Sequence, residues 1–153
     1  MNTAPCDVLI YRHYKERKSK CSLQPLVGRE GFAFRSWKPD MEIHAPGHIL
    51  LEIDAPEIGP ADAGSPLLLL DSTWRLLPRM RASVRGEVLP RSLPAALRTA
   101  YPRRSKFEED PTRGLASIEA LYAALRLMGH RDDSLLDEYH WREPFLEICE
   151  SSL

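Results

Sequence analysis

Leu67-Leu68-Leu69-Leu70-Asp71-Ser72-Thr73-Trp74 is the most informative stretch of this 153-residue chain. Its four leucines follow Gly64-Ser65-Pro66, a group of residues that favours a turn. A short apolar run of this kind is typical of a strand that is buried on both faces, as in a parallel sheet. Ligands of open α/β sheets bind outside the carboxyl ends of the strands, which is where this stretch becomes polar.

The polar end of this stretch has two interpretations. Asp, Ser and Thr are preferred helix caps, so Asp71-Ser72-Thr73 suits a simple cap on a following helix. Alternatively, the Asp71 carboxylate takes part in chemistry at the strand end and Trp74 stacks on a flat ligand. The residue types alone favour the cap.

The remaining pattern predicts an α/β fold. Strands are expected at residues 7–14, 32–37 and 48–53, which are rich in β-branched and apolar residues. Apolar residues at helical spacing predict a helix from Ser117 to Met128, closed by Gly129. Strands come first and helices dominate the end, an order that indicates a mostly parallel sheet with flanking helices.

Three further segments are predicted less regularly. Residues 75–80 begin as a helix, and Pro78 limits how far that helix can be regular. Residues 84–93 indicate a turn and a short extended piece. A last helix is expected to start at Ser134, with Asp137 three residues later, and residues 141–148 either continue it or pack back as a tail.

The length suits one domain or two small lobes with a shared core. We expect an N-terminal α/β lobe at residues 1–92 and a mainly helical C-terminal lobe at residues 93–153. No apolar run approaches the length of a membrane span, and no basic-then-apolar signal precedes residue 20. A cytoplasmic location is therefore the expectation.

Cysteine and histidine spacing does not predict a metal site. The three cysteines, Cys6, Cys21 and Cys149, are far apart in sequence and form no C-x-x-C pair. They are expected to be reduced packing residues. The five histidines form no H-E-x-x-H or similar cluster.

The net charge of −1 hides a strong alternation along the chain. Residues 12–38 have a balance of +6 and residues 75–106 a balance of +8, whereas residues 107–153 have a balance of −7. Residues 39–74 contain seven acids and no Lys or Arg. The two basic blocks predict a one-sided basic surface if the fold brings them together, and the alternative is two solvated faces with no partner.

Five segments, in order along the chain, resemble motifs of the small-subunit ribosomal RNA aminocarboxypropyltransferases. They are Lys20-Cys21-Ser22-Leu23, Asp71-Ser72-Thr73-Trp74, Arg91-Ser92-Leu93-Pro94, Leu115-Ala116-Ser117-Ile118-Glu119-Ala120 and the segment from Tyr139 to Leu146. They are similar to K-C-T/S-G, D-C-S-W, R-L-L-P, L-S-x-V-E-A and F-K-W-G-x-x-F-L. Leu23 replaces the family's glycine, and a longer loop from Ala100 to Gly114 replaces its A-N-P-x-N-Y-G-R-P-Y-K segment.

The resemblance implies a SPOUT-like fold with a C-terminal trefoil knot. It also implies transfer of the 3-amino-3-carboxypropyl group of S-adenosylmethionine to N3 of a uridine-type base in ribosomal RNA, with methylthioadenosine as the second product. D-S-T-W also resembles the D-x-T-W signature of related DTW-domain enzymes that modify uridine in transfer RNA, so the same chemistry on transfer RNA is an alternative. An RNA methyltransferase and a non-catalytic RNA-binding factor of ribosome assembly are the others.

The resemblance also implies roles for individual residues. Asp71 would accept the proton of N3. The backbone of Ser22 and the hydroxyl of Ser117 would hold the carboxylate of the transferred group, and Leu70 would offer its carbonyl to the ribose. Trp74 would pack against the adenine and the methionine chain.

Four more residues complete the implied cofactor site. Leu93 would bind the adenine edge through its N–H, and Arg113 the adenine amino group through its carbonyl. Leu115 and Ala120 would form an apolar wall. Without the resemblance, Leu93, Leu115, Ala120 and Trp74 are ordinary core residues, and Ser117 is a helix N-cap.

The RNA footprint is expected to consist of basic residues from both positive blocks, which would contact phosphates. These are Arg12, Lys15, Arg17, Lys18, Lys20, Arg79, Arg81, Arg103, Arg104 and Lys106.

Overall fold

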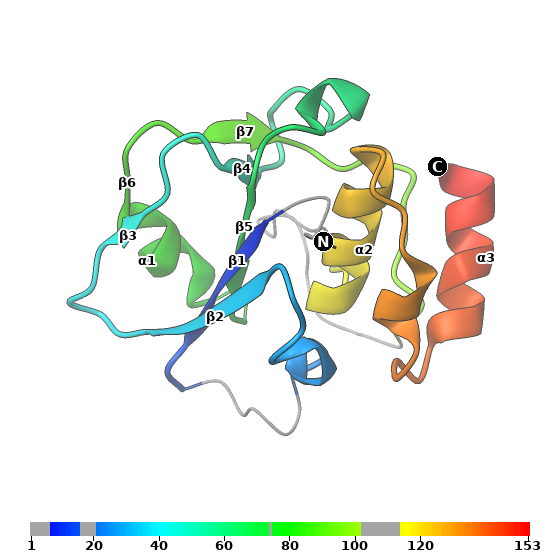
Figure 1. Cartoon of the computed structure of the whole chain (residues 1–153), viewed down its shortest axis with the longest axis horizontal. Helices are drawn as coiled ribbons and strands as arrows, with labels where there is room; N and C mark the ends of the chain where they lie inside the picture. Colours follow the sequence, from blue (N-terminus) through cyan, green and yellow to red (C-terminus); the bar gives the residue numbers. More distant parts are fainter. Residues whose placement is uncertain (1–6, 16–20, 74, 102–113) are drawn as a thin grey trace.

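A five-stranded parallel sheet forms the centre of the molecule (Figure 1). The computed structural model describes residues 7–15, 21–73, 75–101 and 114–153. The strand order is β2-β1-β5-β4-β7, and every pair in it is parallel. Its strands are β1 (Val8–His13), β2 (Phe32–Trp37), β4 (Ile49–Leu51), β5 (Leu67–Asp71) and β7 (Leu89–Arg91). The prediction of an α/β fold with a parallel sheet is confirmed.

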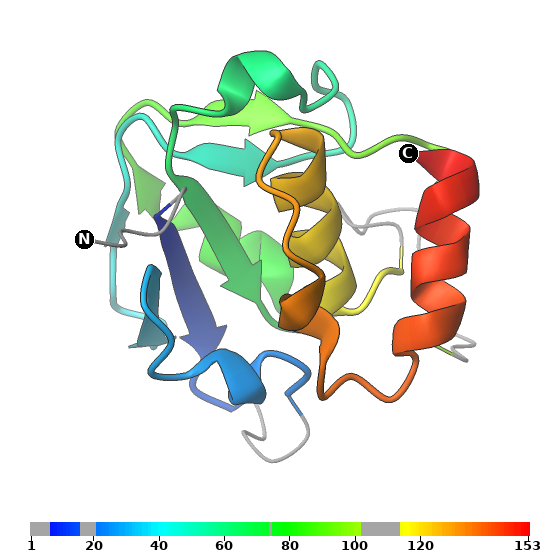
Figure 2. The same cartoon turned by 45° about the vertical axis from the view of Figure 1, so that its right-hand side comes forward.

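Helices cover both faces of this sheet. Figures 1 and 2 show α2 (Ser117–Leu127) beside the sheet, α3 (Arg142–Ser152) outside α2, and α1 (Leu77–Ala82) across the sheet. The described 3-10 helices are η2 (Gln24–Leu26), η3 (Pro60–Asp62) and η4 (Asp133–Leu136). A second, two-stranded parallel sheet joins β3 (Ile43–His44) to β6 (Val84–Arg85), and the sequence pattern did not predict it.

The central strand β5 divides the hydrophobic core into two clusters. Leu67 and Leu69 belong to the large cluster under α2, and Leu68 belongs to the smaller cluster under α1 with Met80. This alternation follows from strand geometry, since successive side chains point to opposite faces. The prediction of a strand buried on both faces is confirmed.

The α2 helix is the most deeply buried helix. Eight of its residues, from Ile118 to Leu125, are buried. Tyr122 packs edge-on against Phe145 of α3, with ring centroids 6.1 Å apart. Two helical layers therefore cover one face of the sheet.

Two local predictions are wrong. The helix after Trp74 starts at Leu77, because Pro78 is tolerated only in the first turn, where its missing N–H has no helical partner. The helix expected from Ser134 is the 3-10 helix η4. Its cap is Asp132, whose carboxylate accepts from the N–H of Ser134, and α3 begins separately at Arg142.

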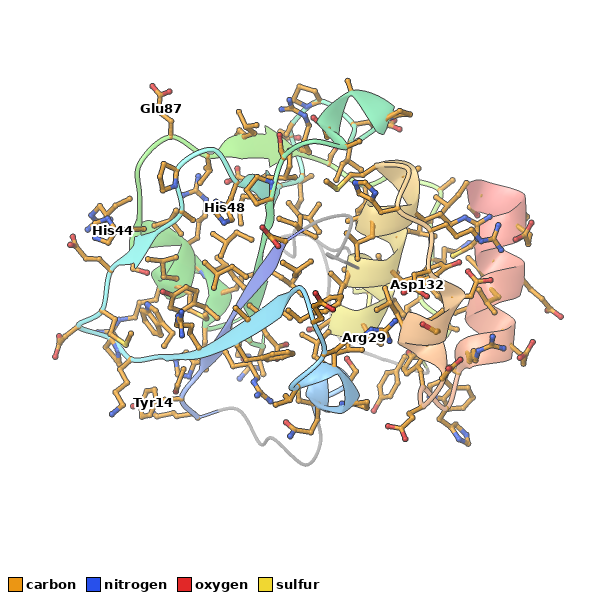
Figure 3. All side chains as sticks on the ribbon, viewed as in Figure 1. Tyr14, Arg29, His44, His48, Glu87 and Asp132 are labelled. Carbon is orange, nitrogen blue, oxygen red and sulfur yellow. The ribbon has the colours of Figure 1, made fainter. Side chains whose placement is uncertain are left out.

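A surface ion pair connects the segment after η2 to η4. Arg29 donates to the Asp132 carboxylate at 2.7 Å and to the Ser134 hydroxyl at 2.6 Å. Figure 3 labels Arg29 and Asp132 on facing segments. The contact spans 103 residues of sequence, and it holds the region of η2 against the helical layer.

Candidate active site

Asp71 is the last residue of β5 and is only 3% exposed. Alternate residues of a strand point to the same face, so the Asp71 side chain points the same way as Leu67 and Leu69. That face is covered by α2, and the carboxylate therefore faces α2. A buried carboxylate needs hydrogen-bond partners, because burial removes the water that would solvate its charge. The surroundings of Asp71 supply them from two distant segments.

Both oxygens of the Asp71 carboxylate accept a hydrogen bond. The Ser117 hydroxyl donates to Oδ1 at 2.5 Å, and the Cys21 thiol donates to Oδ2 at 2.9 Å. The interpretation of Asp71 as a cap of the next helix is wrong, since the side chain contacts α2 and the N-cap of α1 is Leu76. Ser117 likewise is the first residue of α2 and follows its N-cap, Ala116.

Ser22 joins the same cluster from the other side. Its hydroxyl accepts from the backbone N–H of Ile118, in the first turn of α2, at 3.1 Å. Three residues that the resemblance singled out, Ser22, Asp71 and Ser117, are therefore brought together by the fold. They come from the loop before η2, the end of β5 and the start of α2.

Cys21 has a larger role than the sequence indicated, because it bonds directly to Asp71. Burial, together with the negative charge and hydrogen bond of Asp71, raises the pKa of this thiol to about 12. The thiol therefore stays protonated at neutral pH and acts as a donor. Only its place beside Ser22 in the K-C-S segment marked it in the sequence.

We expect Cys21 to resist alkylation at pH 8.5 and to become more reactive in the Asp71→Asn variant. The thiolate is the nucleophile, and losing the negative charge of Asp71 removes one cause of the raised pKa. The rate should rise roughly tenfold for each unit by which the pKa falls. Peptide mapping after iodoacetamide treatment measures it.

Cys149 is the internal control for this experiment. It is buried in α3, where burial raises its pKa to about 11, and Asp71 is not among the causes of this shift. Its rate should be equal in both proteins. An unchanged rate at Cys21 would contradict the contact with Asp71.

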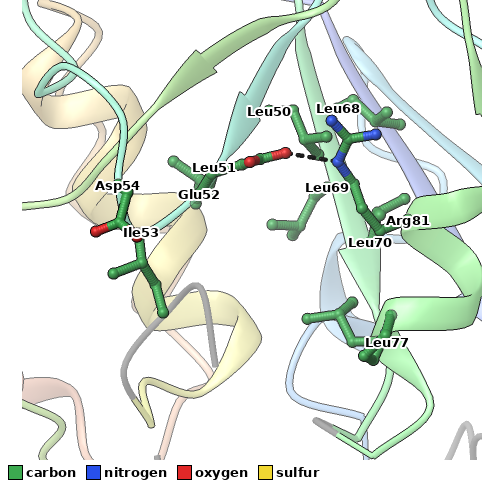
Figure 4. Close-up of a pocket in the computed structure, with 11 residues that line it drawn as sticks. Leu50, Leu51, Glu52, Ile53, Asp54, Leu68, Leu69, Leu70, Leu77 and Arg81 are labelled. Atoms are coloured by element: carbon green, nitrogen blue, oxygen red, sulfur yellow. Dashed lines mark hydrogen bonds and ion pairs between the residues drawn. The ribbon is translucent and has the colours of Figure 1, made fainter. Parts of the chain in front are cut away.

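A cavity of about 520 Å³ opens between the carboxyl ends of β4 and β5 (Figure 4). Leu70, the predicted ribose-binding residue, lines it together with Ile53 and Leu77. Glu52 and Arg81 form an ion pair within the lining, with Arg81 Nε 2.5 Å from Glu52 Oε1. The cavity thus combines apolar walls with one charged pair, at the edge of the sheet where Asp71 ends its strand.

The predicted apolar residues lie in the large core cluster. Leu93, Leu115 and Ala120 are 3%, 4% and 0% exposed, and all three pack in the cluster that contains Leu69. Leu93 follows β7, which is separated from β5 by β4 alone. The predicted binding positions therefore run along one edge of the sheet, from Leu93 to Leu70 and Asp71.

The predicted RNA-binding residues fall into distinct environments. Arg12 is 8% exposed and does not lie on an open surface, in contrast to its expected role as a phosphate contact. Arg81 is paired with Glu52, whereas Lys15 and Arg79 are exposed. The remaining predicted positions lie outside the described residues: Arg17, Lys18, Lys20, Trp74, Arg103, Arg104, Lys106 and Arg113.

Lys15 and Arg79 come from different positive blocks and meet around His13. Burial, followed by the charges of Lys15 and Arg79, lowers the pKa of His13. The fold therefore brings at least one residue of each block to the same surface. In the described part of the chain, no group of three metal-binding side chains occurs. Nor does a helix in those ranges have the length and apolarity to cross a membrane.

Comparison with known proteins gives a structural match. No protein-family model and no curated protein sequence matches the chain. The solved structure of the SAM-dependent rRNA:acp-transferase Tsr3 from Vulcanisaeta distributa superposes on it with a TM-score of 0.73 and 26% sequence identity. The match covers 95% of this chain and 79% of the Tsr3 chain. In both fold and sequence, this chain is therefore similar to Tsr3 over nearly its whole length.

Proposed function

We propose that this protein is an S-adenosylmethionine-dependent transferase that moves a 3-amino-3-carboxypropyl group to N3 of a uridine-type base in ribosomal RNA. The convergence of Ser22, Asp71 and Ser117 at one end of the sheet carries the proposal. The similarity to Tsr3, an SAM-dependent rRNA acp-transferase, supports the substrate and the cofactor. Methylthioadenosine would be the second product.

The residues at this edge fit the two ends of S-adenosylmethionine. The adenine ring is flat with apolar faces, which suits the cavity lined by Leu70, Ile53 and Leu77. The amino acid end is charged and suits the polar cluster around Ser22 and Ser117. On the resemblance, Leu93, Leu115 and Ala120 would hold the adenine, with Trp74 and Arg113 completing the site.

Asp71 would accept the N3 proton of the base. When bound, S-adenosylmethionine supplies a sulfonium that makes each attached carbon electrophilic, so orientation decides which group is transferred. N3 forms its new bond to the carboxypropyl carbon, and the electron pair of the broken C–S bond stays on sulfur. Each Asp71 oxygen already accepts one hydrogen bond, yet a carboxylate oxygen has a second acceptor position for this proton.

The exposed pair Lys15 and Arg79 supports an RNA-binding face. Both cations lie close enough to His13 for their charges to lower its pKa, after the larger effect of burial, and this favours the neutral form of the ring. Phosphate contacts by such residues would make the affinity for RNA strongly dependent on salt. The predicted RNA contacts other than Arg12 and Arg81 would complete this footprint.

Four further features belong to the proposal. They are a SPOUT-like C-terminal trefoil knot, which is a rare topology, a division into lobes at residues 1–92 and 93–153, a cytoplasmic location, and a part in ribosome biogenesis. The parallel sheet with helices on both faces is compatible with a SPOUT-like fold.

The decisive test uses S-adenosylmethionine with two different labels. The protein is incubated with small-subunit ribosomal RNA or transfer RNA, and with cofactor labelled either on the carboxyl carbon or on the methyl group. Carboxyl label in the ribosomal RNA supports the proposal. Transfer of the methyl label alone would show that the protein is a methyltransferase. Carboxyl label in transfer RNA only would show that transfer RNA is the substrate. RNA binding without any transfer would indicate a non-catalytic factor.

We expect Trp74→Ala to weaken S-adenosylmethionine binding about tenfold, because aromatic packing against the adenine contributes roughly 1 kcal/mol or more. Calorimetric titration measures the affinity. The control is Met41→Ala, since Met41 is an exposed large apolar residue that precedes β3. Equal affinities for Trp74→Ala and the unchanged protein would contradict the predicted role.

A further inference from the structure

Arg12 is buried beside Asp71, at the end of the neighbouring strand. The two residues are register partners in the parallel pair of β1 and β5. Alternation along β1 places Arg12 on the same face as Val8 and Ile10, which belong to the core cluster under α2. The guanidinium group is therefore on the side of the sheet where Asp71 meets Ser117.

The described contacts of Arg12 are all uncharged. Its Nη1 donates to Gln24 Oε1 at 2.7 Å, and its Cζ lies 4.8 Å from the centroid of the Phe34 ring. Among the described residues, none of the ion pairs includes Arg12. An arginine that is 8% exposed and has no carboxylate in contact among the described residues is unusual, because a buried charge is expensive to leave without a counter-charge.

The groups around Arg12 favour an anion. The 11-residue helix α2 begins in this cluster, and the first amides of a helix and its dipole attract negative charge. Ser117 itself is only partly buried. The charge of Arg12 is also felt here, since it counteracts the rise in the pKa of Cys21. The site thus contains the negative charge of Asp71 and the positive charge of Arg12. A ligand with one positive and one negative group could pair with both residues.

We propose that Arg12 binds the carboxylate of the 3-amino-3-carboxypropyl group, with Ser22 and Ser117 on its other side. The inference rests on the proposed function, and it assigns Arg12 to the cofactor instead of to RNA. The planar guanidinium can hold a carboxylate through two parallel N–H bonds. The ammonium of the same group has the sign that Asp71 attracts. Arg12 thereby favours a cofactor that retains its whole amino acid end, the group to be transferred.

The test compares three ligands that differ at this end: S-adenosylmethionine, its decarboxylated form, and methylthioadenosine, which lacks the whole carboxypropyl group. Calorimetric titration gives the affinity of each for the unchanged protein and for Arg12→Gln. In Arg12→Gln, S-adenosylmethionine should bind roughly 10- to 100-fold more weakly, the loss expected for a hydrogen bond to a charged group. Decarboxylated S-adenosylmethionine and methylthioadenosine should bind equally to both proteins.

Two variants keep the result interpretable. Arg85→Gln removes a surface arginine that pairs with Glu42, and it should leave all three affinities unchanged. Arg12→Lys keeps the positive charge and should recover part of the lost affinity. Each variant is also titrated with decarboxylated S-adenosylmethionine and methylthioadenosine, so a folding defect, which would weaken all three ligands, cannot by itself produce the expected pattern.

The possible results separate this inference from the proposed function. An equal loss for all three ligands, or no loss for any of them, would overturn the carboxylate role of Arg12. If Arg12→Gln selectively loses S-adenosylmethionine but the unchanged protein transfers only methyl groups, the Arg12 site stands and the proposed function fails. If carboxyl label enters ribosomal RNA and Arg12→Gln binds normally, the function stands and the Arg12 inference fails.

Discussion

Asp71→Asn should slow transfer of the carboxypropyl group by about 10²- to 10⁴-fold, the range for loss of a positioned proton acceptor. Asparagine has nearly the same shape but cannot take up a proton. It can still accept one of the two bonds that Ser117 and Cys21 donate. The affinity for S-adenosylmethionine should fall far less than the rate, by roughly the energy of one hydrogen bond to a charged group, because Asp71 also attracts the ammonium of the cofactor.

Single-turnover kinetics with carboxyl-labelled cofactor measure this loss separately from binding. Asp54→Asn is the matched control, because Asp54 is an exposed carboxylate that lines the cavity at the end of the neighbouring strand β4. Its rate should be close to that of the unchanged protein. If Asp54→Asn lowered the single-turnover rate more than Asp71→Asn, Asp54 and not Asp71 would be the proton acceptor.

The fold was largely predictable from local patterns. Leu67 to Leu70 predicted a strand buried on both faces, and the two core clusters on either side of β5 explain why each leucine is apolar. Ser117 to Met128 predicted α2 within one residue, because both its buried face and its terminating Gly129 leave a signal in the sequence. Such signals depend on neighbouring residues alone.

The site was predictable only in part, because its contacts join distant residues. The bond from Cys21 to Asp71 spans 50 positions, and the bond from Ser117 to Asp71 spans 46. The hydrophobic periodicity of a sequence cannot predict contacts between residues so far apart. The resemblance named Ser22, Asp71 and Ser117 without their geometry, and it did not give Cys21 a role.

Charge patterns were informative about composition and misleading about burial. Arg12 begins the first positive block, yet it occupies an inward-facing position of β1. Strand alternation places it inside, whereas a count of charges placed it on the surface. Arg81 was also expected to contact RNA, but its side chain is paired with Glu52, which follows β4.

Glu119→Ala is expected to lower the free energy of unfolding by about 2–4 kcal/mol, the range for breaking a buried polar network. Glu119 is 0% exposed in the first turn of α2. Its Oε1 accepts from the Thr99 hydroxyl at 2.6 Å and from the N–H of Ala116 at 2.8 Å, and its Oε2 accepts from the N–H of Ala100 at 2.9 Å. Truncation leaves one buried and two half-buried donors without this acceptor.

Glu119→Ala should also affect the cofactor site, because of where these three donors lie in the chain. Ala100 lies before the long loop whose sequence departs from the family pattern, and Ala116 lies after it, beside Leu115 and Ser117. One carboxylate thus joins the two chain segments that flank the loop. Glu119→Gln should be less damaging than Glu119→Ala, because the amide retains one acceptor oxygen and loses the other.

Thermal unfolding measures the loss, which should lower the midpoint by about 5–15 °C for a chain of this size. Glu138→Ala is the matched control, since Glu138 is exposed and its loss should cost less than about 0.5 kcal/mol. Below the transition, Glu119→Ala should also bind S-adenosylmethionine more weakly, because Leu115 and Ser117 lose their anchor at Ala116. If Glu119→Ala unfolds at the same temperature as Glu138→Ala, the buried carboxylate does not hold these segments together.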